Sequence, residues 1–591
     1  MTSVSARSRR SRWGRPVLIV ALCVVVVVTA MASWLLVRGS LARAELEEVL
    51  ALAGSVRSDA AQHDVAAAED LLRDAHQHAE SAAGLTSDPI WRLAHSLPFV
   101  GDDLAAVGVV SRSLADITGP AVPLLNLAGE AVDGGVSTER ILGIFTAASE
   151  PLHETTAAMQ SASDELARFD DADLIPQVAD GVSMLSAMIS EIMPLLSDAS
   201  DAADAIPLVF GSDEPTSILL MVQNGAEVRT GGGIAGTFVL LEAHAGDVRV
   251  VRHADSSLFS RQDSSIIPLD DAVEGFFGGN TGRYVQNSTV PPDFAVTGEL
   301  VSAWWADLTG DAPDVVLSLD VPAIASLVDA TGPLVLPDGS ELAGEDLVDT
   351  VLVEAYRTLD RDEQTEFQKA IAGLTVARLL EGEAGPLAWL GGLAQPISEG
   401  RVSIWSSDPT TAEALSGTVF GGTTARLARS GPDAFGVYFN DATAGKMDAF
   451  LDVSFGAAEL ACASDDVPNV SIAVTMTNKL SADAVGSLPW WVTGDPSLGH
   501  TPGDIVTLVS VSAPEGWFIG GVFDEGTPLL PGEVRLDERP TTSVEIALAP
   551  GETRTIDFRF SAPGPAEVEP VIVHTPLLTD PGEGEFVATC R

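Results

Sequence analysis

The chain has 591 residues and carries 84 acidic against 32 basic side chains, giving a formal net charge of −52 at pH 7. This charge excludes nucleic acid as an expected partner, because a phosphate backbone is bound by proteins of the opposite sign. The length is sufficient for several domains with full hydrophobic cores.

The N-terminus has the pattern of a membrane anchor. Residues 1–15 contain five arginines and no acidic residue, and an uncharged apolar run follows at 16–37. A helix over that run rises about 33 Å, enough to cross a hydrocarbon core of roughly 30 Å. The positive-inside rule predicts a cytoplasmic N-terminus. We therefore expect a single-pass cell-membrane protein that contacts the lipid bilayer through residues 16–37, with an extracytoplasmic body.

A cleaved signal peptide is the alternative for this segment. Ala30-Met31-Ala32 places small residues at the spacing of a cleavage site. The apolar run continues as far as Val37, however, which favours an uncleaved anchor. Both alternatives place the body outside the cytoplasm.

Three regions of different texture follow the apolar run. Residues 38–205 repeat alanine, leucine and acidic residues at helical spacing, which predicts a helical stalk or bundle. Residues 206–430 alternate β-branched runs with helical patterns, which predicts an α/β domain. Residues 431–591 contain alternating strands separated by turn residues, which predicts a β-sandwich.

Two cysteines lie in this C-terminal region, Cys462 and Cys590, while Cys23 lies in the apolar run. An oxidising compartment favours a disulfide between Cys462 and Cys590. Two unpaired thiols are the alternative.

Standard catalytic motifs are missing from the sequence. It contains no P-loop, no G-x-S-x-G nucleophile elbow and no zinc signature. The acidic cluster at 170–173 lacks the glycine and the distal glutamate of a calcium loop, so we interpret it as a solvated helix terminus. The sequence predicts no metal site and leaves open whether the protein is an enzyme.

A glycine-rich polar segment at 223–237 lies between the apolar runs 218–222 and 238–241. Consecutive glycines permit positive φ, so their N–H groups can form a concave nest for an anion, and an arginine adds a bidentate fork. This chemistry suits a phosphate group. The ligand-binding residues predicted in this loop are Asn224, Arg229, Gly231, Gly232 and Gly233. The alternative is that the glycines only turn the chain and that Arg229 pairs with Glu227.

A second polar stretch spans residues 252–257 and contains Asp255. Asp255 is a candidate base or metal ligand. The alternative is a strand-end turn or a helix cap, roles that aspartate followed by serines often fills.

Residues 223–232 resemble the Q-N-N-x-E-x-R-x-x-G-G signature of the bacterial domain-of-unknown-function family 4012. Supporting segments lie at 97–101, 292–294, 330–333, 407–408, 445–448 and 488–494. The family has no assigned activity, so this resemblance implies a family without implying a reaction.

The order of strands, acid-x-Arg motif and glycine loop is also distantly similar to the LytR-CpsA-Psr envelope phosphotransferases, which transfer polyprenyl-pyrophosphate-linked glycans to the cell wall. Glu227 and Arg229 fall on the D-x-R of that family, and Asp255 falls on the aspartate of its P-R-D. The resemblance implies the fold of that family for the central α/β domain, a divalent cation as cofactor, and a polyprenyl-phosphate-linked glycan or cell-wall polymer as partner.

Two cationic donors of that family are missing here. Residues 233–237 stand where it has G-R-S-D-T, and Ala254 replaces the arginine of P-R-D. Each lost donor costs roughly 10²–10³ in rate unless another arginine replaces it. The candidate replacements are Arg252, Arg261 and Arg283.

Two hypotheses follow for function. In the first, an envelope protein binds, or also transfers, a phosphorylated or lipid-linked glycan; Arg229 clamps the anion, while Asp255 and Glu227 orient a metal or act as base. In the second, the protein is a non-catalytic envelope scaffold or interaction protein, and the glycine loop is structural.

Overall fold

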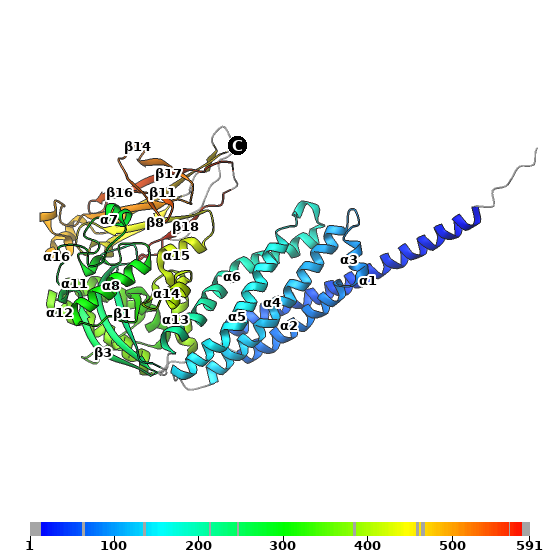
Figure 1. The fold of residues 1–591 in the computed structure, drawn as a ribbon, viewed down its shortest axis with the longest axis horizontal. Helices are drawn as coiled ribbons and strands as arrows, with labels where there is room; N and C mark the ends of the chain where they lie inside the picture. The colour runs from blue at the N-terminus through cyan, green and yellow to red at the C-terminus, as the bar shows by residue number, and fades with distance from the viewer. Residues whose placement is uncertain are drawn as a thin grey trace, which may run out of the picture. The chain divides into compact units, whose positions relative to one another are not determined.

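The computed structural model describes residues 14–61, 65–133, 138–211, 214–244, 247–381, 386–456, 460–462, 467–565 and 568–581. The chain divides into two compact units. Unit 1 comprises Met1–Asp133 and Ala147–Ser200, and unit 2 comprises Gly134–Thr146 and Asp201–Arg591. Figure 1 shows a helical part and a part that contains the sheets.

The helical part confirms the prediction of a helical N-terminal region. Its helices are α1 (Gly14–Ala61), α2 (Val65–Thr86), α3 (Pro89–Ala94), α4 (Gly101–Asp133), α5 (Thr138–Leu166) and α6 (Pro176–Phe210). Buried residues on several of them form one core that includes Val49, Ala79, Ala106, Leu114 and Ile189. The small side chains of the alanines allow close approach of neighbouring helices, so this alanine-rich sequence packs as a bundle.

Helix α1 runs without a break from the apolar segment into the bundle. It has 48 residues, which at about 1.5 Å per residue is roughly 72 Å. Two helices among the described residues are long and apolar enough to cross a membrane, over Val25–Val56 and Pro176–Phe210. The second contributes Val182 and Leu185 to the bundle core, while 17% of its apolar window is buried. The first is compatible with the predicted single anchor.

A five-stranded sheet forms the centre of the α/β region in unit 2. Its order is β3 (Asp247–Asp255), β2 (Ile234–His244), β1 (Thr216–Asn224), β4 (Val315–Asp320) and β7 (Val402–Ser406). Strands β1 and β4 are parallel, and the other pairs are antiparallel.

Helices cover both faces of this sheet. Successive side chains of β1 point to opposite faces, so the strand contacts helices on each side. Leu219 and Met221 share a core with Trp304 of α8 (Phe294–Thr309). Val222 packs on the other face against α9 (Val321–Thr331) and α12 (Arg361–Glu381). This arrangement confirms the predicted α/β region.

Shorter elements complete the region. They are α7 (Asp271–Phe277), β5 (Leu334–Val335), β6 (Glu341–Leu342), α10 (Gly344–Asp349), a π-helical turn (Thr350–Glu354), α11 (Ala355–Thr358), α13 (Pro386–Ser398), α14 (Pro409–Ser416) and α15 (Gly422–Arg429).

The C-terminal region is rich in strands, as predicted, and its strands form two sheets that pack together. The first contains β9 (Leu451–Phe455), β10 (Leu460–Cys462), β11 (Pro468–Asn478), β13 (Phe518–Asp524), β14 (Thr527–Pro528) and β17 (Thr553–Ser561). The second contains β8 (Ala434–Asp441), β12 (Ile505–Ser512), β15 (Gly532–Leu536), β16 (Arg539–Leu548) and β18 (Val571–His574), and a short helix α16 (Trp490–Thr493) lies outside both sheets. Phe435 of β8 joins the sheets, with ring centroids 5.7 Å from Phe560 of β17 and 5.3 Å from Trp517.

The predicted disulfide between Cys462 and Cys590 lies outside the residues whose side chains the structure describes. Cys462 ends strand β10.

The contact between α8 and β7 provides a test of this packing. A Cβ atom added at Gly298 would lie 2.2 Å from Cγ of Trp405, so Gly298→Ala overpacks the helix against the strand. We expect the free energy of unfolding to fall by about 1–3 kcal/mol, measured by urea unfolding of the full chain in detergent. The control is Gly275→Ala in α7, where an added Cβ meets nothing within 4 Å; equal stability of the two variants would contradict the packing.

Candidate functional site

The glycine-rich segment is the loop of the β1–β2 hairpin. Asn224 pairs with Ile234 at the end of the ladder, so residues 225–233 project beyond the sheet. Asn224 tightens the loop by accepting a hydrogen bond on Oδ1 from the N–H of Ala226 at 3.0 Å. The N–H of Ile234 donates across the loop to the carbonyl of Glu227 at 3.1 Å.

The three consecutive glycines donate to acceptors within the protein. The N–H of Gly231 donates to the carbonyl of Thr289 at 3.0 Å, and that of Gly232 donates to the carbonyl of Arg229 at 2.8 Å. The N–H of Gly233 donates to Oε1 of Gln223 at 2.8 Å. These groups therefore do not form the predicted anion nest.

Backbone geometry explains why glycine stands at two of these positions. Gly232 has a φ of 122°, a value that L side chains rarely adopt. A Cβ atom at Gly233 would lie 2.4 Å from the carbonyl carbon and oxygen of Asn224. The glycines turn the chain and allow close approach, as the structural alternative predicted.

Arg229 points into the interior of unit 2 and is only 7% exposed. Its NH1 donates to the carbonyl of Val228 at 2.8 Å, and its NH2 donates to Oδ1 of Asn287 at 3.2 Å. NH1 also lies 3.8 Å from Oδ2 of Asp441, at the end of β8. The pairing of Arg229 with Glu227, stated as part of the structural alternative, is wrong, and the guanidinium contacts other groups of the protein.

Glu227 pairs instead with Lys446, and both side chains are largely buried. Burial alone would lower the pKa of the Lys446 ammonium, but the carboxylate of Glu227 outweighs this effect and raises that pKa. Lys446 lies 219 residues from Glu227 and was not among the predicted site residues. A signal was available: Lys446 is one of only three lysines in the chain and falls within a segment that resembles family 4012.

The loop also pairs with the C-terminal region through the main chain. The N–H of Asp441 donates to the carbonyl of Val228 at 2.9 Å, and the N–H of Asp448 donates to the carbonyl of Ala226 at 3.1 Å. Oδ2 of Asp448 accepts from the N–H of Val228 at 2.8 Å. These bonds join the loop to the segment between β8 and β9.

The carboxyls of Asp441 and Asp448 are both buried beside this loop. Burial raises the pKa of Asp441, against the opposing effect of Arg229. Burial, with the nearby Asp441, raises the pKa of Asp448 well above its usual range. Oδ1 of Asp448 has no hydrogen-bond partner among the described residues, so Asp448 is better accommodated as the neutral acid.

Asp255 lies at the end of β3 and caps the short 3₁₀ helix Ser256–Leu258. Its Oδ1 accepts from the N–H of Ser257 at 2.9 Å, and its Oδ2 lies 2.8 Å from Nζ of Lys369 in α12. Burial would raise the pKa of Asp255, but the contacts with Lys369 and Ser257 lower it. The capping role, stated as the alternative, is confirmed.

Arg252 lies on the opposite face of β3 from Asp255, because the two residues are three positions apart in the strand. It is exposed, and its guanidinium carbon lies 5.7 Å from the ring centroid of Trp305 in α8. The structure therefore does not bring Arg252 together with Asp255.

The residues present do not fit the divalent cation that the phosphotransferase resemblance implies. The carboxylates of Asp255 and Glu227 are each paired with a lysine, Lys369 and Lys446 respectively. The described part of the chain holds no group of three or more metal-ligating side chains.

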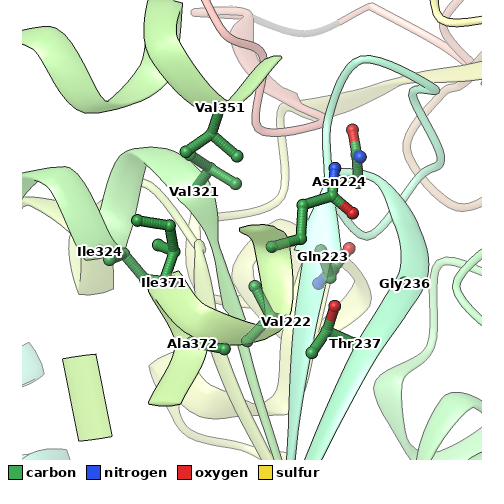
Figure 2. A pocket seen from close by; sticks show the side chains of 11 residues that line it. Val222, Gln223, Asn224, Gly236, Thr237, Val321, Ile324, Val351, Ile371 and Ala372 are labelled. Carbon is green, nitrogen blue, oxygen red and sulfur yellow. The ribbon is translucent and has the colours of Figure 1, made fainter. Parts of the chain in front are cut away.

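A small cavity lies between the sheet and helices α9 and α12 (Figure 2). Its volume is about 20 Å³, and Val222, Ile324 and Ile371 line its apolar side. Asn224 forms part of its polar side and donates from Nδ2 to the hydroxyl of Tyr356 at 2.5 Å. A space of this size holds about one water molecule, so it does not admit a sugar phosphate.

Comparisons with known proteins support one of the two resemblances. Residues 213–356 match the family model described as "Protein of unknown function (DUF4012)". No curated protein matches the chain. The solved structure of protein gbs0355 from Streptococcus agalactiae is similar at 13% identity and a TM-score of 0.23, over 35% of this chain and 74% of that chain. The family match is to family 4012 and not to the LytR-CpsA-Psr phosphotransferases.

The raised pKa of Asp448 predicts how stability depends on pH. The folded protein keeps this proton where the unfolded chain has lost it, so the contribution of Asp448 to stability falls as pH rises above 3.8. An asparagine side chain has no such proton, and its amide oxygen can still accept from Val228. Asp448→Asn should therefore gain stability relative to the wild type as pH rises, measured by urea unfolding from about pH 4 to about pH 8.

Asp338→Asn is the matched control with the opposite sign. Hydrogen bonds from Ser340 lower the pKa of Asp338, so its contribution is present above pH 3.8 and lost below it. This variant should lose relative stability as pH rises from about 3 to about 5 and change little at higher pH. The same slope for both variants would refute the assignment of Asp448.

Proposed function

We propose that the protein is a membrane-anchored scaffold or interaction protein of the cell envelope, without catalytic activity of its own. One observation favours a scaffold over a glycan-binding protein: the polar groups of the β1–β2 loop contact other groups of unit 2. Arg229 contacts Asp441 and Asn287, and the N–H groups of Gly231, Gly232 and Gly233 donate to protein acceptors. A ligand at this loop would first have to break these bonds.

Membrane anchoring is supported by the start of the chain. Five arginines precede an apolar run at 16–37, which favours a cytoplasmic N-terminus. In α1 the side chains of Val25, Val26, Val27 and Val28 are 56–60% exposed. A continuous exposed apolar surface of this kind is stable in contact with lipid.

The charge of the body supports a scaffold over a binder of phosphate polymers. Without the five arginines of residues 1–15, 27 basic residues face 84 acidic ones, a formal charge of −57. An excess of this size keeps a protein soluble and repels polyanions. A partner that recognises this body would be neutral or basic.

Arg229→Ala tests the structural role of the loop. Removing one partner of a buried ion pair leaves an uncompensated charge, at a cost of about 3–5 kcal/mol. We expect a loss of that size in the free energy of unfolding. Arg252→Ala is the control, since an exposed cation–π contact is worth about 0.5–1 kcal/mol.

Ligand binding at the loop is tested on the full chain in phospholipid nanodiscs, titrated with a polyprenyl pyrophosphate. The scaffold proposal expects no saturable binding by the wild type. Saturable binding that Arg229→Lys abolishes, while the variant stays as stable as the wild type, would overturn the proposal in favour of a phosphorylated-glycan site.

A further inference from the structure

The turn that connects α3 to α4 exposes an unusual amount of apolar surface. We call residues 93–100 the α3–α4 turn. Leu93 is 62% exposed, Leu97 and Val100 are each 46% exposed, and Phe99 is 97% exposed. Soluble surfaces rarely gather large apolar side chains in this way, and a contiguous apolar patch marks a binding surface.

The backbone at Phe99 is strained, with a φ of 74°. This left-handed conformation is costly for a bulky side chain. The N–H of Gly101 donates to the carbonyl of Leu97 at 3.0 Å and closes the turn across Phe99, while Phe99 itself is 97% exposed. This conformation displays the phenyl ring outward, where it is available for a contact outside the chain.

The apolar side chains of the α3–α4 turn are not separated by charged residues. The α3–α4 turn contains no acidic residue, no lysine and no arginine, and His95 is its one titratable side chain. Burial, together with the nearby Arg112, lowers the pKa of His95, so the imidazole is neutral near pH 7. The turn is therefore suited to an apolar partner.

The position of the turn is fixed by contacts with α1, at the end of the apolar run. Nε of Arg38 donates to the carbonyl of Leu85 at 2.7 Å and lies 3.0 Å from Oδ2 of Asp88. Nε1 of Trp34 donates to the same carboxylate at 3.2 Å. Asp88 also caps α3, so the turn is held beside residues 34–38. Figure 1 shows α3 where α1 leaves the bundle.

Burial of Trp91 makes this attachment rigid. Its Nε1 donates to the carbonyl of Leu104 in α4 at 2.9 Å, and its ring packs against Gly39 of α1. A Cβ at Gly39 would lie 3.6 Å from that ring. α1, α3 and α4 are thus locked together directly beyond the apolar run.

We propose that the α3–α4 turn is a second membrane contact, in which Leu93, Leu97, Phe99 and Val100 enter the interfacial region of the bilayer that α1 crosses. The proposal rests on the proposed membrane anchoring, because residues 34–38 mark the level at which α1 leaves the lipid. A lipid partner fits the apolar, uncharged turn and the half-exposed Trp34 beside it, since tryptophan favours the membrane interface.

The test replaces one side chain at a time with p-benzoylphenylalanine in the full chain, reconstituted in phosphatidylcholine vesicles. The positions are Phe99 in the turn, Val28 in the apolar run, and Leu195 in α6. Leu195 is a matched control because it is 59% exposed. It lies about 29 Å along α6 from Pro176, and the N–H of the preceding Ile175 donates to Asp103 near the turn at 2.8 Å.

Irradiation followed by mass spectrometry reports what each position contacts. We expect a mass shift of one phospholipid at positions 28 and 99 and none at 195. Lipid adducts at 28 without adducts at 99 would overturn the second contact and leave the anchor intact. Loss of adducts at both positions would overturn the anchor itself. Adducts from 99 to another protein chain would replace the lipid with a protein partner and overturn the proposal.

Discussion

Two buried ion pairs join the α/β region to the strand-rich region. Glu227 pairs with Lys446, and Arg229 lies against Asp441. Burying charges costs several kcal/mol per ion, so such pairs tolerate no loss of one partner. Main-chain bonds between the loop and the segment around Asp448 run beside them and fix the register. The two regions consequently share one hydrophobic core, which includes Val228 and Met447.

This arrangement changes how the glycine-rich motif is understood. A loop with an arginine, an acid and three glycines has the composition of a phosphate site, yet composition does not show which way the donors point. Here Gly232 supplies a positive φ, Gly233 allows close approach, and Arg229 faces inward. The part of the chain that matches family 4012 includes this loop. The matching residues can therefore reflect the connection between the α/β and strand-rich regions as well as a binding site.

Local sequence patterns correctly predicted features that depend on neighbouring residues, such as secondary structure and helix capping. Helical and alternating periodicities gave the order of helical, α/β and strand-rich regions, and an aspartate followed by serines correctly suggested the cap at Asp255. Local patterns do not predict which residues pair when they are far apart in the sequence. The two partners considered for Arg229 were a phosphate group and Glu227, two residues away, whereas the guanidinium contacts Asp441 across 212 residues. No periodicity in one sequence encodes such a pairing.

Helix α1 contains the apolar segment and also contributes to the core of the bundle, and it is continuous between these two parts. A transmembrane helix adjusts its tilt when its apolar length exceeds the local bilayer thickness. Under the proposed anchoring, the adjustment would turn the bundle by the same angle, since Arg38 and Gly39 already lie in the packed part of α1. Bilayer thickness would then set the inclination of the bundle to the membrane, so a thinner or thicker membrane would present it at a different angle.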